Sequence, residues 1–229
     1  MAVNNDDVKL IGAWASPYVM RPRVALNIKS VDYEFLQEQF GSKSELLLKS
    51  NPVHKKIPVL LHNGKPICES SIIVEYIDEV WSSSPSILPS DPHNRALARF
   101  WAAYLDEKWF PNMKGVITAA SEEEKNAAVD QLKEVAVEME EVSRGEDFFG
   151  GEKIGFVDIA FGSMLGWARA IQVMAGVKLL DEEKTPGLVK WAEKFSADPA
   201  VKDVLPEAEK LVEFSKLLSA KFKTAAASS

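Results

Sequence analysis

Residues 8–18 read VKLIGAWASPY, and this stretch decides the fold, because an apolar strand-like run passes directly into the start of a helix. Serine is favoured at the cap of a helix and proline at its first position, so Ser16 and Pro17 predict a helix that begins here. The first N–H groups of that helix point outward and, with the helix dipole, favour an anion. The Ser16 hydroxyl can cap the helix, attack as a nucleophile, or donate a hydrogen bond to a bound anion. The choice among these three roles decides the function.

The first eighty residues alternate between strand-like and helix-like periods. We expect a βαβ unit, then a short helix, then a ββα unit. The expected elements cover residues 9–13, 17–29, 33–36, 44–49, 57–61, 67–68 and 70–81. Asn63-Gly64 predicts a tight hairpin between the last two strands, because both residues tolerate positive φ.

Serine and proline dominate residues 82–92, and this composition predicts a linker. Beyond it the apolar spacing is that of helices only, including one over 93–110 and one over 155–175. We therefore expect an α/β domain over residues 1–82, a linker over 83–92 and an all-helical domain over 93–229.

Two helix starts in the second half carry polar residues three positions apart. Ser121 and Glu124 predict a capping box, in which each side chain satisfies the backbone donor of the other residue. At the other start, Gly155 stands where a serine or threonine would complete a box with Asp158. Half of that box is missing, so we expect this start to be less well stabilised.

The composition argues against several classes of function. The chain has 229 residues, 46% of them hydrophobic, and a formal net charge of −7, which disfavours nucleic acid or an anionic membrane as a partner. No run approaches the roughly 20 apolar residues that span a bilayer, and Asn4-Asn5-Asp6-Asp7 does not resemble a signal peptide. Cys68 is the only cysteine, and the three histidines share no ligand spacing. We therefore expect a cytosolic protein with neither a disulfide nor a metal site.

Five polar residues fall at strand ends or helix starts of the first domain, where ligands of α/β sheets gather. They are Ser16, Lys43, Lys56, Glu69 and Ser70. Taken singly, each has a structural explanation: the serines cap helices, worth about 1 kcal/mol apiece, the lysines are solvated charges, and the glutamate complements a helix dipole. As a set, they predict one groove that binds a charged ligand.

Five segments carry a resemblance to a known family. They are SPYVMR (16–21), NPVHKKIPVL (51–60), CESSII (68–73), ARFWAAY (98–104) and GFVDIA (155–160). Together they resemble the tau class of plant glutathione S-transferases, and the likeness extends over essentially the whole chain. It implies a thioredoxin-like first domain, an all-helical second domain and a homodimer. It also implies conjugation of glutathione to hydrophobic electrophiles in detoxification, with reduction of organic hydroperoxides as a side activity.

The resemblance assigns Ser16 to the glutathione sulfur. It implies that the backbone of Ile57 pairs with the cysteinyl residue of the peptide, and that the Ile57–Pro58 bond is cis. A hydroxyl donor and a helix N-terminus both favour a thiolate over a thiol whose reference pKa is about 8.5. No His–Asp pair or glycine-flanked elbow accompanies Ser16, and a cysteine suited to disulfide exchange is absent from this position. These observations favour the donor role over the nucleophile.

The resemblance distributes the charged groups of glutathione among the remaining residues. Lys43 and Lys56 are implied to hold the glycine carboxylate, Glu69 the γ-glutamyl ammonium, and Ser70 with its own N–H the neighbouring carboxylate. The pairing is chemically sensible by itself, because lysines and a helix start suit carboxylates and a glutamate suits an ammonium.

The second substrate is expected between the domains. The expected wall residues are Trp14, Tyr18, Phe110, Lys114, Trp167 and Phe214. The tryptophans have an alternative explanation as core residues. A protein that carries glutathione conjugates or other apolar ligands without catalysis would use the same two sites, and it is the alternative to the enzyme.

Overall fold

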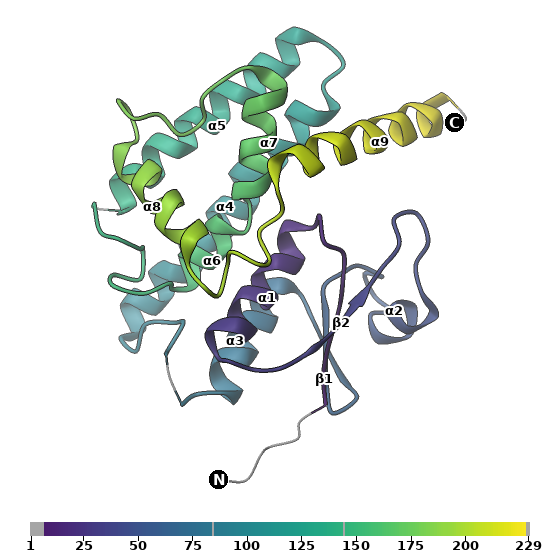
Figure 1. Ribbon diagram of the computed structural model, residues 1–229, viewed down its shortest axis with the longest axis vertical. Helices are drawn as coiled ribbons and strands as arrows, with labels where there is room; N and C mark the ends of the chain where they lie inside the picture. The colour runs from purple at the N-terminus through teal and green to yellow at the C-terminus, as the bar shows by residue number, and fades with distance from the viewer. Residues whose placement is uncertain (1–6, 84, 144, 228–229) are drawn as a thin grey trace.

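A computed structural model describes residues 7–83, 85–143 and 145–227 and places a sheet unit beneath a helical unit (Figure 1). The sheet unit contains, in chain order, β1 (Val8–Gly12), α1 (Pro17–Ile28), β2 (Glu34–Gln37), α2 (Glu45–Ser50), β3 (Val59–His62), β4 (Lys65–Cys68) and α3 (Ser70–Val80). This order matches the prediction. Residues 1–6 of the expected first domain, Ser84 of the expected linker, and Arg144 and 228–229 of the expected helical domain lie outside the described residues.

The sheet has the strand order β2-β1-β3-β4, with β2 parallel to β1 and the other two pairs antiparallel. Successive side chains of a strand point to opposite faces, so the sheet builds two cores. Leu10 pairs with Leu60 in the core shared with α1 and α3. Ile11 pairs with Val59 on the other face, which Leu47 of α2 covers. The hairpin predicted between β3 and β4 is confirmed, since Asn63-Gly64 has φ values of 51° and 74°.

The junction of β1 and α1 depends on a glycine. A Cβ on Gly12 would lie 2.4 Å from Cγ1 of Val19, so a side chain there would push the helix away from the strand. The Ser16 N–H donates to the Ala13 carbonyl at 3.0 Å and tightens the turn between them. The sequence thereby brings the start of α1 to the end of the sheet.

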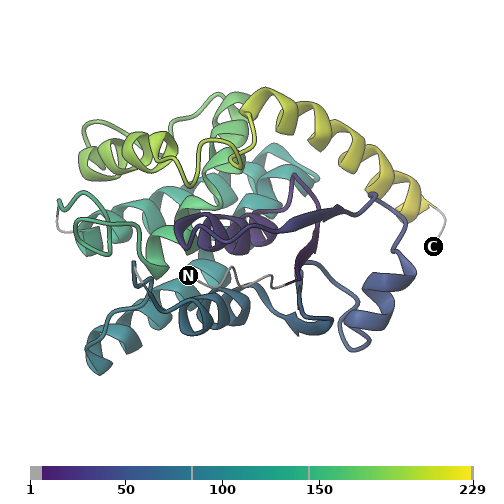
Figure 2. The same ribbon diagram turned by 60° about the horizontal axis from the view of Figure 1, so that its bottom comes forward.

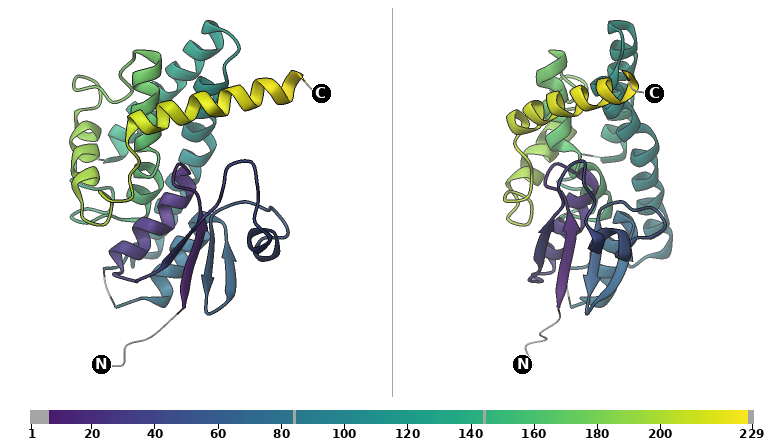
Figure 3. Two further views of the ribbon diagram at one scale, coloured as in Figure 1. Left: turned by 45° about the vertical axis from the view of Figure 1, so that its right-hand side comes forward. Right: turned by 90° about the vertical axis from the view of Figure 1, so that its right-hand side faces the viewer.

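The helical unit contains, among the described residues, α4 (Pro92–Thr118), α5 (Glu122–Ser143), α6 (Phe156–Gly162), α7 (Leu165–Ala175), α8 (Pro186–Ala197) and α9 (Ala208–Ala227). In Figure 2, α9 runs from the other helices toward the side of the molecule that carries α2. The loop that leads into α1 lies beneath α9 in both views of Figure 3. This crossing places residues of α9 close to Ser16.

The predicted end of the first long helix at residue 110 is wrong, because α4 continues through Pro111 to Thr118. A proline inside a helix removes one backbone donor. Here both Pro111 and Glu107, whose carbonyl loses that donor, are exposed to water. Beyond the proline, Met113 and Val116 are buried and continue the apolar stripe. Packing therefore outweighs the cost of the missing hydrogen bond.

The single helix predicted over 155–175 is also wrong, because it divides into α6 and α7. The Ala160 carbonyl accepts from the Ser163 hydroxyl at 3.0 Å and from Arg21 Nη2 at 3.3 Å. The Met164 N–H donates instead to Phe161, one residue closer than a regular helix requires. Side-chain donors thus compete with the helical ladder and break it.

The two predicted helix starts have different outcomes. Glu124 N–H donates to Ser121 Oγ at 3.2 Å, but the Glu124 carboxylate accepts from Ala120 rather than from Ser121, so only half of the predicted box forms. At Gly155 the missing half is offset, because the fully buried Asp158 carboxylate accepts from four N–H donors, including Gly155 N–H at 2.8 Å. The start of α6 is therefore well held, contrary to our expectation.

Candidate active site

Ser16 occupies the cap of α1 with an extended backbone (φ −86°, ψ 119°). Its hydroxyl oxygen accepts from the Val19 N–H at 3.4 Å, a long bond for a helix cap. A serine hydroxyl that accepts one bond keeps its own proton for donation to another group. Ser16 is partly exposed and lines a cavity of about 330 Å³. The cap and donor roles are therefore compatible in one residue.

Three cavities adjoin around Ile57, which lines all of them. We call them the lysine cavity (about 360 Å³, lined by Lys43, Lys55 and Lys56), the Glu69 cavity (about 370 Å³, lined by Glu69, Ser70 and Asp106) and the Ser16 cavity described above. Their shared wall makes a continuous groove along one end of the sheet, with a polar part and an apolar part.

The lysine cavity is built from two turns of the first unit. Lys43 precedes α2, whose start is fixed because Ser44 Oγ accepts from Leu47 N–H at 3.1 Å. Lys56 precedes Ile57, and the Ile57–Pro58 peptide bond is cis, as the resemblance implied. Both lysines are exposed and present ammonium groups to any anion in this part of the groove.

The Glu69 cavity lies at the start of α3. Glu69 has a positive φ of 71°, unusual for a residue with a side chain, and no cap bond from its carboxylate, which remains exposed with His54 Nε2 3.9 Å away. Ser70 is buried, and its hydroxyl oxygen accepts from Arg21 Nη1 at 3.3 Å. The Ser70 proton is therefore available to an anion at the helix start.

Arg21 is a residue of the site that the sequence analysis missed. Its side chain is only 1% exposed and bonds both carboxylate oxygens of Asp106, at 2.9 and 2.6 Å. Its guanidinium also lies 4.8 Å from the centre of the Tyr18 ring. The signal was present in the sequence, because position 21 falls on the same helix face as Pro17 and Val24, which are buried. A charge on an apolar face predicts a buried partner.

Tyr18 lines both the Glu69 cavity and the Ser16 cavity. Burial, reinforced by the Asp106 carboxylate, raises the pKa of its hydroxyl to about 12. The phenol is therefore protonated at neutral pH and contributes no charge to the groove.

The Ser16 cavity is lined by most of the expected wall residues. The structure brings together Tyr18, Phe110, Lys114, Trp167 and Phe214. Trp14 is outside this lining and packs edge-on against the Phe214 ring, with ring centres 5.5 Å apart. Trp167 is buried and donates from Nε1 to the Ala15 carbonyl at 2.7 Å. It therefore serves the core and the cavity at once.

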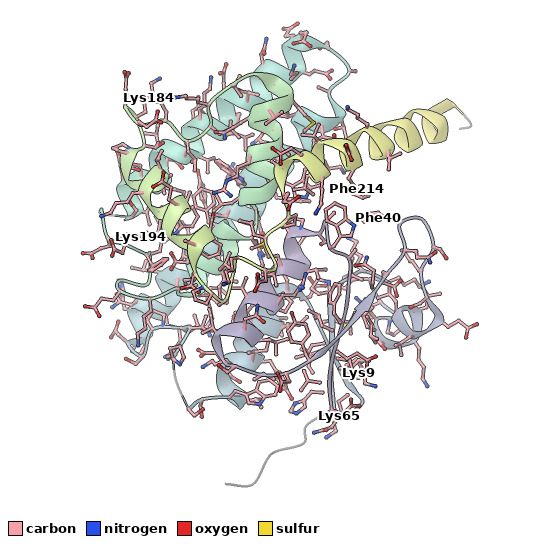
Figure 4. All side chains as sticks on the ribbon, viewed as in Figure 1. Lys9, Phe40, Lys65, Lys184, Lys194 and Phe214 are labelled. Carbon is pink, nitrogen blue, oxygen red and sulfur yellow. The ribbon has the colours of Figure 1, made fainter. Side chains whose placement is uncertain are left out.

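Phe40 is a second residue that the sequence analysis missed. It lies in the loop after β2 and lines both the lysine cavity and the Ser16 cavity. Its ring is 4.3 Å from the Phe214 ring of α9, and Figure 4 shows the two side chains next to each other. Met113, Ile117 and Thr118 were also missed, and like the expected Lys114 they lie on the part of α4 beyond its predicted end.

In the part of the chain that the structure describes, no helix has the length and apolar character needed to cross a membrane. Within the same residues, no three or more His, Cys, Asp or Glu side chains gather closely enough to hold a metal ion.

Fold and site together define a two-unit protein of the thioredoxin-like class, with a groove lined by charged residues beside an apolar cavity. Residues 6–79 match the family described as Glutathione S-transferase, N-terminal domain, and residues 95–199 match Glutathione S-transferase, C-terminal domain. Glutathione S-transferase U17 of Arabidopsis thaliana is 64% identical over 217 residues, which cover 93% of this chain and 96% of that relative.

Two solved structures extend the comparison. The tau-class glutathione S-transferase of mango, Mangifera indica, is 68% identical with a TM-score of 0.89, covering 93% of this chain and 98% of that one. A rice glutathione transferase in complex with glutathione is 34% identical with a TM-score of 0.89, and the match covers 96% of this chain and 99% of that one. The chain belongs to the tau class of the glutathione S-transferase family. It is an enzyme that joins glutathione, its co-substrate, to a second molecule through the glutathione sulfur.

Proposed function

We propose that Ser16 activates the glutathione sulfur for attack on hydrophobic electrophiles held in the Ser16 cavity, in a detoxifying reaction. One observation carries the proposal: the hydroxyl at the start of α1 accepts one bond, which leaves its proton for donation, and it lines the Ser16 cavity, which adjoins the two other cavities at Ile57. Ser16 donates a hydrogen bond to the thiolate, which is the nucleophile. None of the described residues lining this cavity is a histidine that could activate the serine itself.

Glutathione occupies the polar groove in this proposal. Lys43 and Lys56 bind its glycine carboxylate, the backbone of Ile57 pairs with its cysteinyl residue, Glu69 binds its ammonium, and Ser70 binds the second carboxylate. The proposal is supported by the charges of the cavities. Lysines outnumber carboxylates in the lysine cavity, where the single carboxylate, Glu38, accepts from the Ser44 N–H, whereas Glu69, Asp106 and a helix start line the other cavity together with Lys56. Residues 1–82 then form the glutathione-binding domain, 83–92 the linker, and 93–229 the domain that contributes the electrophile site.

The energetic requirement is modest. Lowering the thiol pKa by about two units takes about 2.7 kcal/mol of preferential stabilisation of the thiolate. A hydrogen bond to an ionised group contributes about 1.5–3 kcal/mol, and a helix start adds about 0.3–1 kcal/mol. Ser16 and α1 together therefore suffice without deprotonation of the serine.

The test measures glutathione affinity and turnover of 1-chloro-2,4-dinitrobenzene in Ser16→Ala. We expect glutathione Kd to stay within about threefold, while kcat falls about 100-fold, because the lost donor acts on the charged sulfur. Ser16→Thr keeps a hydroxyl and serves as the matched control, with partial turnover. An unchanged kcat in Ser16→Ala contradicts the proposal. Wild-type protein that binds glutathione and its conjugates but has no measurable turnover would instead be the non-catalytic carrier.

We further propose that the protein works in the cytosol as a homodimer. Ile72 of α3 and Phe100 of α4 are 56% and 57% exposed, and an ion pair between Glu75 and Arg99 joins the same two helices. Exposed apolar side chains on adjoining helices support a second copy as their partner. Sedimentation analysis tests this: we expect a dimer for the wild type and a monomer for Phe100→Glu, and a monomeric wild type contradicts the proposal.

A further inference from the structure

The Ser16 cavity contains one charged side chain among its described lining residues. That residue is Lys114, whereas the rest of the lining is formed by neutral and mostly apolar side chains such as Phe110 and Trp167. No carboxylate lines this cavity, in contrast to the adjoining Glu69 cavity, which contains Glu69 and Asp106. The charge of an otherwise apolar cavity therefore depends on one ammonium group.

Lys114 is held on a regular element. It lies on α4 one turn after Phe110 and one turn before Thr118, and all three residues line the cavity. Its side chain is exposed and makes no ion pair within the described residues. Other lysines of this acidic chain, such as Lys29 and Lys178, pair with carboxylates of the protein. Lys108 of the same helix also has no ion pair among the described residues, so Lys114 is distinguished by its place in the cavity lining, where its ammonium can meet a ligand.

The start of α1 adds to the positive potential of the cavity. Ser16 and Pro17 line the cavity at the start of α1, where the helix dipole is positive. In the proposed reaction this end of the cavity faces the thiolate. Lys114, on a different helix, is then the cation that remains for the second substrate.

We propose that the preferred electrophiles of this enzyme carry a carboxylate, which Lys114 binds while the apolar walls hold the rest of the molecule. This inference rests on the proposed function, since it names the class of substrate taken by the same cavity. A volume of about 330 Å³ suits an acceptor with a single aromatic ring. Attraction between opposite charges raises affinity and fixes which end of the acceptor faces the sulfur.

A matched pair of acceptors isolates the carboxylate. In 4-chloro-3,5-dinitrobenzoate and its methyl ester the same substitution occurs: the sulfur bonds to the ring carbon, the C–Cl bond breaks, chloride leaves with the bonding pair, and the thiol proton goes to solvent. The readout is the ratio of kcat/KM for the acid to kcat/KM for the ester. This ratio cancels differences in glutathione activation and in folding among variants.

We expect Lys114→Gln to lower the acid-to-ester ratio about fivefold, the size of one partly exposed ion pair, and Lys114→Glu to lower it further. The ratio in the wild type should also fall as salt is added, because salt screens exposed charges. Lys108→Gln removes an exposed lysine of α4 that lines none of the three cavities, and it should leave the ratio at the wild-type value. A ratio that is the same in Lys114→Gln and the wild type overturns the inference, whereas a wild type that converts neither acceptor overturns the proposed function as well.

Discussion

The polar and apolar parts of the groove are built in different ways. The lysine cavity and the Glu69 cavity take most of their lining from residues 38–71, at turns and helix starts of one small sheet unit. The Ser16 cavity instead combines the loop after β2 with α1, α4, α7 and α9, which are far apart in the sequence. In the proposed complex, short local segments thus recognise glutathione. The shape of the second site depends on how distant helices pack.

Arg21 contacts Ser70 of the Glu69 cavity and Tyr18, which lines both the Glu69 cavity and the Ser16 cavity, and its removal should have the largest effect. Arg21→Ala leaves the Asp106 carboxylate without its guanidinium and removes the donor to Ser70. The Asp106 side chain left behind is 31% exposed, so water partly replaces the lost partner. We therefore expect a loss of about 2–3 kcal/mol in the free energy of unfolding measured with urea, below the cost of a fully buried pair. Both parts of the groove should be damaged together.

Arg23→Ala is the matched control for this prediction, because Arg23 lies on the same helix but is only half-buried. Its Nε donates to the Tyr33 hydroxyl at 3.1 Å, and its guanidinium lies over the Phe35 ring. We expect a loss of about 1 kcal/mol from these contacts. Equal losses for the two variants would contradict the prediction that the contacts of Arg21 with Asp106 and Ser70 stabilise the fold more than those of Arg23.

Substitutions in the aromatic pair Phe40 and Phe214 should distinguish the two parts of the groove by their effects on KM. Phe214→Ala opens the Ser16 cavity alone, so we expect KM for a hydrophobic electrophile to rise about tenfold, the cost of one lost aromatic contact, while KM for glutathione changes little. Phe40→Ala should raise both KM values, because Phe40 lines both cavities. Steady-state kinetics with each substrate varied in turn makes the measurement.

Val173→Ala provides the control for these aromatic variants, since Val173 is an exposed apolar residue of α7 that lines none of the three cavities. It should leave both KM values unchanged. If Phe40→Ala raises KM for the electrophile but not KM for glutathione, the two cavities are not coupled through this side chain.

The smallest effects should come from the lysine cavity. In the proposed complex, Lys43 and Lys56 each form one exposed ion pair with the glycine carboxylate. Lys43→Ala and Lys56→Ala should therefore each raise KM for glutathione about fivefold with little change in kcat. Lys49→Ala, on the exposed side of α2 outside the three cavities, is the control. A fall in kcat without a rise in KM would show that these lysines act on the sulfur rather than on binding.

The sheet unit and the polar groove could be predicted because their signals are local. Ser16-Pro17 marks a helix start within two residues, and Asn63-Gly64 marks a turn in the same way. A helix start or a turn of this kind can be predicted from neighbouring residues without knowing any distant contact. The resemblance added the pairing of each polar residue with one group of glutathione.

The apolar cavity could be predicted only in part, because long-range contacts override local preferences in the helical unit. Pro111 signals an end to α4, yet the burial of Met113 and Val116 carries the helix on and brings three unpredicted residues to the cavity. Arg21 breaks the ladder between α6 and α7 from more than a hundred residues away in the sequence. The continuation of α4 and the break between α6 and α7 both depend on tertiary contacts, so neighbouring residues alone do not predict them.

The most direct test of the account is a pH titration of bound glutathione, followed by the ultraviolet absorbance of its thiolate. We predict an apparent thiol pKa about two units below the free value of about 8.5 in the wild type, and a pKa at least about one unit higher in Ser16→Ala, because the helix start remains but the hydroxyl donor is lost. The same thiol pKa in both proteins would contradict the claim that Ser16 stabilises the thiolate.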